Sequence, residues 1–417
     1  VSPAVVNIYT TEISRSARNP FRNFNNNLFD KFFKDFLPPT RSQKRSLGSG
    51  VLINADGFIL TNEHVIAKAA KIHVVLSDKQ EFDASVIGAD TKSDLAIIKI
   101  ESDTPLPFVE MGRSDDLMIG EQVLAIGNPF GLQQTVTTGI ISALNRNLRA
   151  GKNKVYSDFI QVDASINPGN SGGPLLNING SLIGINTAIY QKAEGIGFAI
   201  PIDHAKRIVL ELVNYGKVRR GWLGVSVQEL DAQLLRHFKL DRQRGVLVVG
   251  VAEKSSAGKA GLKRGDIIIG IDDHEVGNKS DFRGRMASYT VGSSIRFSLL
   301  RDGKKMGLRV RIASIPKSYI KEFTRNWLGL HIQENSERFA RGNRLVTSKG
   351  MVVVEVIPNS VAGRIGISPG DIIRQMNQKR VDNEEDYNKA VADMNNPDRI
   401  LLLVQRGRQG YYVTLEP

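Results

Sequence analysis

The stretch "DASINPGNSGGPLLNINGSLIGINTAI" at residues 163–189 sets one serine, Ser171, between glycines, with Pro174 close behind. Such a loop has two interpretations. Glycines are common wherever a tight turn needs unusual backbone angles. They also let backbone N–H groups converge beside a nucleophilic hydroxyl, where they can bind an oxyanion. The second interpretation requires a general base elsewhere in the chain.

Two other short motifs supply the partners that a nucleophilic serine needs. "TNEHVI" places His64 where a predicted strand ends, and "SDLAIIKI" places Asp94 before an apolar strand. Taken alone, His64 could be a structural histidine and Asp94 a turn residue. Together, the order His64, Asp94, Ser171 is the triad order found on paired β-barrels. We expect Ser171 to attack, His64 to take its proton and Asp94 to orient His64, with no metal or cofactor.

The oxyanion hole is predicted on the nucleophile loop itself, at Gly169, Asn170 and Ser171. The backbone N–H groups of Gly169 and Ser171 are the expected donors. Digestive serine proteases carry Asp immediately before the nucleophile, where it pairs with a newly cut N-terminus, whereas this chain has Asn170. Because an amide cannot form that ion pair, we expect activation by ordering of loops and not by proteolytic processing.

Composition limits the class of protein. At 417 residues the chain is long enough for two to four domains. Hydrophobic residues make up 41% and charged residues 24%, which is typical of a globular protein. Zero cysteines exclude disulfides, thiol nucleophiles and cysteine metal sites. The chain begins "VSPAVVNIYT", without a charged and then apolar leader, so we expect any targeting peptide to have been removed.

The positive charge is confined to the C-terminal half. Residues 1–216 contain 21 Lys and Arg and 21 Asp and Glu, so the whole net charge of +13 lies in residues 217–417. The cations are scattered and form no basic run of the usual length, which argues against nucleic acid as a partner. An anionic membrane surface or a carboxylate ligand fits this charge better.

An internal repeat organises the same half of the chain. "RGWLGVSVQEL" at 220–230 corresponds to "RNWLGLHIQEN" at 325–335, and "GDII" follows at 265–268 and at 370–373. Every corresponding pair is offset by 105 residues, as for Trp222 and Trp327. Two copies of one small α+β domain are therefore predicted, at residues 217–315 and 316–417.

Residues 1–216 indicate a different, all-β domain. "SGVLINADGFILTNEHVI" forms two predicted strands joined at Asp56-Gly57, and further short strands follow at regular spacing. This pattern is typical of a barrel or sandwich. The exception is the insertion at 13–47, which contains six phenylalanines. We expect it to be a functional loop that docks on another apolar surface.

"TNEHVI", "SDLAIIKI" and "GNSGGPLLNINGSLIGINTAI", followed by two "WLG…GDII" domains, closely resemble the HtrA family of serine proteases, of the DegP/DegQ (Do-like) type. The resemblance implies a mainly β fold, with a trypsin-like double β-barrel and two PDZ domains. It also implies a periplasmic endopeptidase that degrades misfolded or unfolded proteins without ATP and has chaperone activity. Homotrimers that assemble into larger cages are implied as well.

Carried over by position, the family's triad again falls on His64, Asp94 and Ser171. Its primary specificity pocket falls on Ile166 and Ile189, which favour aliphatic side chains, although both could be ordinary barrel core residues. The regulatory loops fall on 13–47, on about 144–158 with Arg146, and on 189–196.

The repeats match the peptide-binding loop of PDZ domains. In the first copy, Trp222, Leu223, Gly224 and Val225 are expected to bind the free, apolar C-terminus of a peptide, with Phe282 and Met286 in the groove wall. In the second copy, Trp327 could equally be a core anchor. A non-enzymatic chaperone or PDZ scaffold is the alternative function, and the intact triad argues against it as the sole role.

Overall fold

The computed structural model describes residues 1–11, 45–67, 69–128, 134–150, 154–167, 169–189, 195–238, 240, 244–272, 274–343, 345–377, 379–392 and 399–416. The chain divides into two compact units. The first comprises Val1–Arg219 with Gly284–Thr290, and the second comprises Arg220–Arg283 with Val291–Pro417. Most of the predicted insertion at 13–47 lies outside the described residues.

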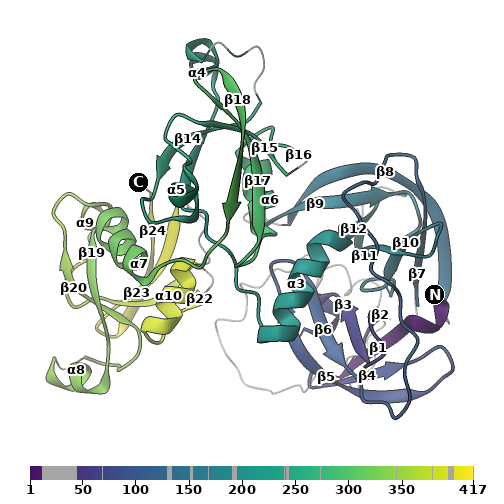
Figure 1. Cartoon of the computed structure of the whole chain (residues 1–417). Coiled ribbons are helices and arrows are strands. Elements are labelled where there is room, and N and C mark those ends of the chain that lie inside the picture. Colours follow the sequence, from purple (N-terminus) through teal and green to yellow (C-terminus); the bar gives the residue numbers. More distant parts are fainter. Residues whose placement is uncertain are drawn as a thin grey trace. The chain divides into compact units, whose positions relative to one another are not determined.

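Two closed six-stranded antiparallel barrels form the first unit (Figure 1). The strands of the first barrel, in spatial order, are β1 (Val5–Thr11), β2 (Arg45–Leu52), β3 (Phe58–Thr61), β6 (Leu95–Lys99), β5 (Glu81–Asp90) and β4 (Lys71–Val75). Those of the second are β10 (Pro174–Asn177), β11 (Leu182–Ile189), β12 (Gly197–Pro201), β9 (Lys154–Val162), β8 (Thr135–Ala150) and β7 (Gln122–Gly127). The mainly β double barrel predicted from the sequence is confirmed.

Closure of each barrel follows from strand pairing at its seam. In the first barrel β1 pairs with both β2 and β4, and in the second β10 pairs with both β11 and β7. Closed barrels leave no unpaired strand edge. The short helix α2 (Glu63–Ile66) follows β3, and the short 3-10 helix η1 (Ser2–Ala4) precedes β1.

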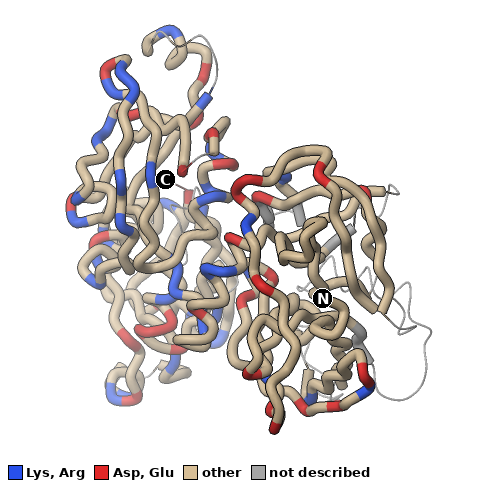
Figure 2. Tube along the Cα trace, turned by 45° about the vertical axis from the view of Figure 1, so that its right-hand side comes forward, with Lys and Arg blue, Asp and Glu red and all other residues tan. Residues whose placement is uncertain are grey.

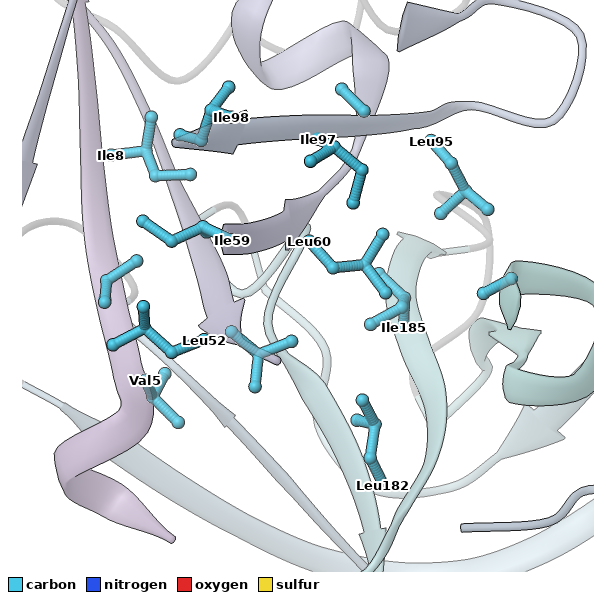
Figure 3. Close-up of a cluster of buried hydrophobic side chains, with 14 of the residues drawn as sticks. Val5, Ile8, Leu52, Ile59, Leu60, Leu95, Ile97, Ile98, Leu182 and Ile185 are labelled. Carbon is cyan, nitrogen blue, oxygen red and sulfur yellow. The ribbon is translucent and has the colours of Figure 1, made fainter. Parts of the chain in front are cut away.

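Aliphatic side chains fill the first barrel (Figure 3). Ile59, Leu60, Ile97 and Ile98 are fully buried, and each such side chain contributes about 1.5–3 kcal/mol through burial. Strand β4 shows the alternating pattern of a strand with one buried face, whereas four of the five residues of β6 are buried in succession. The reason is that helix α3 (Ile202–Tyr215) packs against β6 and covers its outer face.

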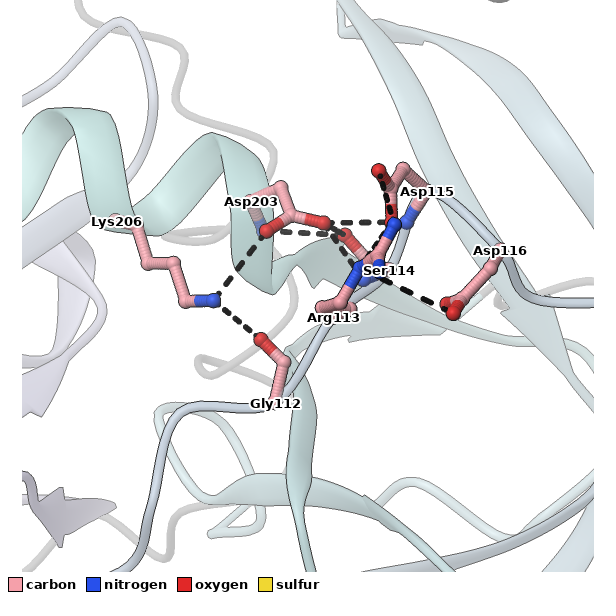
Figure 4. A network of polar contacts seen from close by, with 7 residues as sticks. All are labelled: Gly112, Arg113, Ser114, Asp115, Asp116, Asp203 and Lys206. Carbon is pink, nitrogen blue, oxygen red and sulfur yellow. Dashed lines mark hydrogen bonds and ion pairs between the residues drawn. The ribbon is translucent and has the colours of Figure 1, made fainter.

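Helix α3 is amphipathic and fixed at both ends. Its buried residues recur at helical spacing, and it ends at Gly216, which has a left-handed backbone conformation. In its first turn, Asp203 accepts hydrogen bonds from the Ser114 amide at 2.7 Å and from the Asp115 amide at 3.1 Å (Figure 4). Lys206 bonds to the Gly112 carbonyl oxygen. These contacts join α3 to the segment that connects the two barrels.

The second unit contains two six-stranded sheets with the same strand order. The first sheet has β13 (Val225–Glu229), β14 (Val246–Val251), β15 (Ile267–Ile271), β16 (His274–Glu275), β17 (Ser294–Arg301) and β18 (Lys304–Arg311). The second has β19 (Leu330–Glu334), β20 (Met351–Val356), β21 (Ile372–Met376), β22 (Lys379–Arg380), β23 (Ile400–Arg406) and β24 (Gln409–Leu415). The helices are α4 (Ala232–His237), α5 (Ser256–Ala260), α6 (Lys279–Ala287), α7 (Lys317–Phe323), the π-helical turn η3 (Thr324–Leu328), α8 (Glu337–Gly342), α9 (Val361–Arg364) and α10 (Glu384–Ala392).

The aspartate of each "GDII" motif is buried and forms the same ion pair with an arginine. Asp266 is bound by Arg301 at 2.6 and 2.7 Å, and Asp371 is bound by Arg406 at 2.7 and 2.8 Å. Burial alone would raise the pKa of Asp371, but the bonds from Arg406 and its neighbours outweigh it and hold that pKa below the ordinary value of 3.8. The repeated sequence therefore encodes a repeated side-chain contact as well as a repeated fold.

The charge asymmetry predicted from the sequence is visible along the trace (Figure 2).

In the part of the chain that the structure describes, no helix has both the length and the apolar character needed to cross a bilayer.

Candidate active site

His64 lies in the first turn of α2, which begins directly after β3. Asn62 lies at the N-cap position between β3 and α2, and its side-chain amide donates to the Asp94 carbonyl oxygen at 2.9 Å. The His64 side chain is only 8% exposed. The strand, cap and helical turn together hold the imidazole at the end of the first barrel.

Asp94 closes the turn between β5 and β6 in a left-handed backbone conformation, with φ of +55°. Aspartate tolerates this conformation better than most residues. Its carboxylate accepts hydrogen bonds from the His64 amide at 3.1 Å and from His64 Nδ1 at 2.8 Å. A carboxylate only accepts hydrogen bonds, so Nδ1 carries the proton and Nε2 is left as the basic nitrogen in the neutral ring.

Thr187 is a third donor to Asp94 that the sequence analysis missed. Its Oγ1 donates to Asp94 Oδ2 at 2.8 Å, and its carbonyl oxygen accepts from Ser171 Oγ at 3.2 Å. This one residue of β11 therefore contacts both the acid and the serine. A signal was present, because Thr187 and its neighbour Asn186 are polar residues in the otherwise apolar strand "LIGINTAI", and a buried hydroxyl needs a partner.

Hydrogen bonds fix the loop around Ser171. Three of its amides are engaged: Asn170 donates to the Asn167 carbonyl, Gly172 to the Asn186 carbonyl and Gly173 to the Asn170 carbonyl. Within the described residues, the amides of Gly169 and Ser171 have no hydrogen-bond partner. These are the two donors expected for the oxyanion. The Asn170 amide, which was included in the predicted hole, is occupied by Asn167 and is not available as a donor.

Close packing explains one of the glycines that frame Ser171. Gly172 has a φ of +83°, and a Cβ at this position would lie 2.1 Å from the Ser49 carbonyl oxygen and 2.3 Å from Thr61 Oγ1. Any side chain there would push the nucleophile loop away from the first barrel. The glycine is needed for the contact between the barrels as well as for the turn.

The predicted specificity residues have different outcomes. Ile166 is 4% exposed and belongs to the apolar core of the second barrel, where a Cβ on Gly197 would lie 2.6 Å from its Cγ1. Ile189 ends β11, and its side chain lies outside the described residues. The choice between a pocket and an ordinary core therefore stays open, and the pocket remains a prediction.

The predicted regulatory segment at 144–158 belongs to strands β8 and β9, which pair with each other. Arg146 lies in β8, and its Nε donates to Gln161 Oε1 at 3.0 Å on the neighbouring strand. The described residues of the segment, 144–150 and 154–158, thus lie in paired strands with several register shifts. Most of the third regulatory segment, 189–196, lies outside the described residues.

In the first repeat, the loop at Leu223 and Gly224 presents backbone donors. Within the described residues, the amides of Leu223 and Gly224 have no hydrogen-bond partner. Gly224 has a φ of +77°, and a Cβ there would lie 2.2 Å from Ser255 Cβ. Val225 begins β13, which is the edge strand of its sheet. Free amides beside an edge strand are what a PDZ peptide site requires.

The other residues predicted for this site are buried. Trp222 is 7% exposed and packs against Tyr319, with ring centroids 4.3 Å apart. Phe282 and Met286 are each 5% exposed. Their part in a groove wall remains a prediction.

The corresponding loop of the second repeat differs in its hydrogen bonds. The preceding residues form the π-helical turn η3, and the Gly329 amide donates to the Thr324 carbonyl oxygen. Thr324 Oγ1 also bonds to the Tyr387 hydroxyl at 2.7 Å on α10. Burial raises the pKa of Tyr387. An amide that the first repeat leaves free is thus already used in the second.

Comparisons with known proteins agree with this architecture. Residues 48–185 match the trypsin-like peptidase domain, and residues 221–312 and 352–406 each match a PDZ domain. A probable periplasmic serine endoprotease DegP-like of Chlamydia pneumoniae is 42% identical over 407 residues, which cover 96% of this chain and 82% of the relative. One of the same description from Pseudomonas fluorescens is 36% identical over 441 residues, covering 100% of this chain and 91% of the relative.

Solved structures give the same assignment. The HtrA-type protease AlgW with a tripeptide is 40% identical and has a TM-score of 0.55, covering 76% of this chain and 95% of that chain. AlgW with a decapeptide is 41% identical, has a TM-score of 0.51, and covers 76% of this chain and 96% of that chain. The chain therefore belongs to the HtrA family of serine proteases, of the DegP-like type with two PDZ domains, and is a serine endopeptidase.

Proposed function

We propose that Ser171, His64 and Asp94 carry out peptide hydrolysis through an acyl-enzyme. The hydroxyl of Ser171 turns from Thr187 toward His64, transfers its proton to Nε2 and attacks the scissile carbonyl. Asp94 stabilises the imidazolium that forms. His64 then protonates the leaving amine, and water repeats the sequence on the acyl-enzyme. The single observation that carries this proposal is the pair of partner-free amides, Gly169 and Ser171, beside the nucleophile.

The substrates are unfolded or misfolded proteins of the periplasm, cleaved without ATP. The names of the relatives support the location, and ATP independence is what the family resemblance implies. If Ile166 and Ile189 line the primary pocket, aliphatic residues precede the cleaved bond. Chaperone activity and assembly of homotrimers into cages complete the proposal, which here rests on the family resemblance.

The first PDZ domain recognises the free C-terminus of a substrate or activator peptide, through the amides of Leu223 and Gly224. The AlgW structures with bound peptides support peptide recognition within the family. In the second PDZ domain the Gly329 amide is occupied, so we expect weaker recognition of a carboxylate there. Peptide binding to the first PDZ domain then regulates cleavage.

An anionic membrane surface is a further proposed partner, and β17 and β18 support it. Arg296 and Arg309 are both exposed and lie directly opposite each other on these strands, so they place two positive charges side by side on one face of the sheet. The corresponding pair in the second PDZ domain is Leu401 and Thr414, which carries no charge. This pair of arginines is therefore found in the first PDZ domain and not at the corresponding positions of the second.

The test is cleavage of unfolded casein by the full chain in buffer without ATP and with a metal chelator. We expect cleavage by the wild type and a loss on the order of 10⁶ in kcat for Ser171→Ala. Co-sedimentation of casein with Ser171→Ala should persist, because that substitution leaves the binding surfaces in place. Appreciable cleavage by Ser171→Ala would overturn the mechanism.

A further inference from the structure

Ser49 is a fully buried residue of β2 whose polar groups are all engaged around the active site. Its backbone amide donates to the Ser171 carbonyl oxygen at 2.9 Å. Its side-chain hydroxyl donates to the Gly169 carbonyl oxygen at 2.6 Å and accepts from the Asn128 amide at 3.0 Å. Its own carbonyl oxygen accepts from Thr61 Oγ1 at 2.7 Å. Ser49 belongs to the first barrel, whereas the nucleophile loop and Asn128 belong to the second.

The bond to the Gly169 carbonyl holds one particular peptide plane. In a trans peptide the carbonyl and the following amide point in opposite directions. The Gly169 carbonyl is held by Ser49, and the Asn170 amide at the other end of the plane is held by the Asn167 carbonyl. The plane therefore cannot rotate without breaking a buried hydrogen bond.

The two amides proposed as oxyanion donors lie in the peptide planes on either side of this one. The Gly169 amide precedes it and the Ser171 amide follows it. A rotation of the Gly169–Asn170 plane changes the torsion angles at both of its ends and so alters the angle between the two donors. Oxyanion stabilisation depends on donors that are already aimed at the developing charge.

We propose that Ser49 is a positioning residue for the oxyanion hole: from the first barrel, its hydroxyl holds the Gly169–Asn170 peptide in the orientation that aims the Gly169 and Ser171 amides at one point. The inference rests on the proposed function, since it presumes that these amides bind the oxyanion. The hydroxyl contacts neither substrate nor triad side chains. Its effect belongs to the transition state, in which the oxyanion exists, and not to binding of the intact substrate.

The test is Ser49→Ala in the full chain, with a peptide substrate and two inhibitors of matched sequence. One is a peptide aldehyde, which forms a tetrahedral adduct with the nucleophile. The other is the corresponding product peptide, which binds without forming one. We expect kcat to fall roughly 10- to 100-fold, because a misplacement of about 1 Å can cost 10²-fold. The affinity for the aldehyde should fall by a similar factor, with KM and product affinity within about 2-fold.

Thr61→Val is the matched control. It also removes one buried hydroxyl bond at Ser49, but that bond ends on the Ser49 carbonyl oxygen and not on the nucleophile loop. It should retain kcat and aldehyde affinity within about 3-fold, even if its melting temperature falls as much as that of Ser49→Ala. The acid side of the pH profile should be the same in all three proteins, because the bond between His64 and Asp94 is untouched.

Ser49→Cys provides a second variant in case Ser49→Ala does not fold. The thiol has a similar shape and is a weak donor, so the losses in kcat and in aldehyde affinity should be smaller than for Ala but still parallel. The inference is overturned if aldehyde and product affinities fall together, or if kcat stays within 3-fold in a folded variant. Failure of the proposed function would appear separately, as cleavage by Ser171→Ala.

Discussion

Replacement of Thr187 by valine removes one hydroxyl and leaves the shape of the side chain almost unchanged. The lost bond is the one from Thr187 Oγ1 to Asp94 Oδ2, at 2.8 Å, to a carboxylate whose side chain is only 3% exposed. A hydrogen bond to a charged group contributes about 1.5–3 kcal/mol to stability. The two donors from His64 remain, so the Asp94 carboxylate loses one of these three hydrogen bonds and keeps two.

We expect the loss to be concentrated in kcat. In the proposed mechanism, Asp94 orients His64 and stabilises the imidazolium that exists only after proton transfer. If about half of the bond's contribution is expressed in the transition state, the barrier rises by about 0.8–1.5 kcal/mol and kcat falls roughly 4- to 13-fold. KM should stay within about 2-fold, because the Thr187 carbonyl oxygen that accepts from Ser171 is part of the backbone and is retained.

The assay is steady-state cleavage of a fluorogenic peptide, with active sites counted by a serine-directed phosphonate. Thr187→Ser is the matched control, because it restores the hydroxyl without the methyl group and should recover most of kcat. The reasoning is refuted if Thr187→Val keeps kcat within 2-fold of the wild type. It is also refuted if Thr187→Ser is as impaired as Thr187→Val, since packing and not the hydroxyl would then explain the loss.

Three further predictions concern the PDZ domains. Gly224→Ala should abolish the preference for a free-acid peptide over its C-terminal amide in calorimetry, because the added Cβ would lie 2.2 Å from Ser255 Cβ and displace the loop. Gly329→Ala should leave that preference intact. Equal effects of the two substitutions would contradict the assignment of peptide binding to the first PDZ domain. Arg309→Glu should weaken co-sedimentation with anionic vesicles about 30-fold, because it changes two units of charge at roughly 1 kcal/mol each. Thr414→Glu, at the corresponding position of the second PDZ domain, should change co-sedimentation little. A loss that is insensitive to salt would count against the proposal. Because the pKa of Asp371 is lowered in the folded state, its carboxylate stabilises the second PDZ domain above about pH 4, and this stabilisation is lost as the pH falls further. Hydrogen exchange of β21 and β23 should therefore lose protection between pH 6 and 3 more steeply in the wild type than in Asp371→Asn. Identical slopes in the two proteins would refute this prediction.

Patterns along one segment predicted an all-β barrel or sandwich and the repeated domains, and the family resemblance specified the double barrel. Alternation in strands such as β4, a turn at Asp56-Gly57 and a constant offset of 105 residues are local or periodic features, and each has a direct structural cause. The triad could also be proposed, because three motifs in a recognised order restrict the choice. Thr187 and Ser49 could not be predicted in this way. Thr187 bonds to Asp94, which lies 93 positions away in the sequence, and Ser49 bonds to Gly169, which lies 120 positions away. Nothing in the segments around Thr187 and Ser49 indicates where those partners lie.

The two PDZ domains differ at a point that the repeat itself leaves open. "GWLGV" and "NWLGL" match closely, and the motif alone does not decide whether the second loop also binds a carboxylate. The difference arises just upstream, where "KEFTRN" continues α7 into the π-helical turn η3 and "KVRRG" forms no helix. Because a helix leaves its last carbonyl groups without intrahelical partners, the Thr324 carbonyl captures the Gly329 amide. We therefore expect the residues that precede the motif to decide whether a loop can bind a peptide terminus, because the first repeat has no helix before its loop and its Gly224 amide is left without a partner among the described residues.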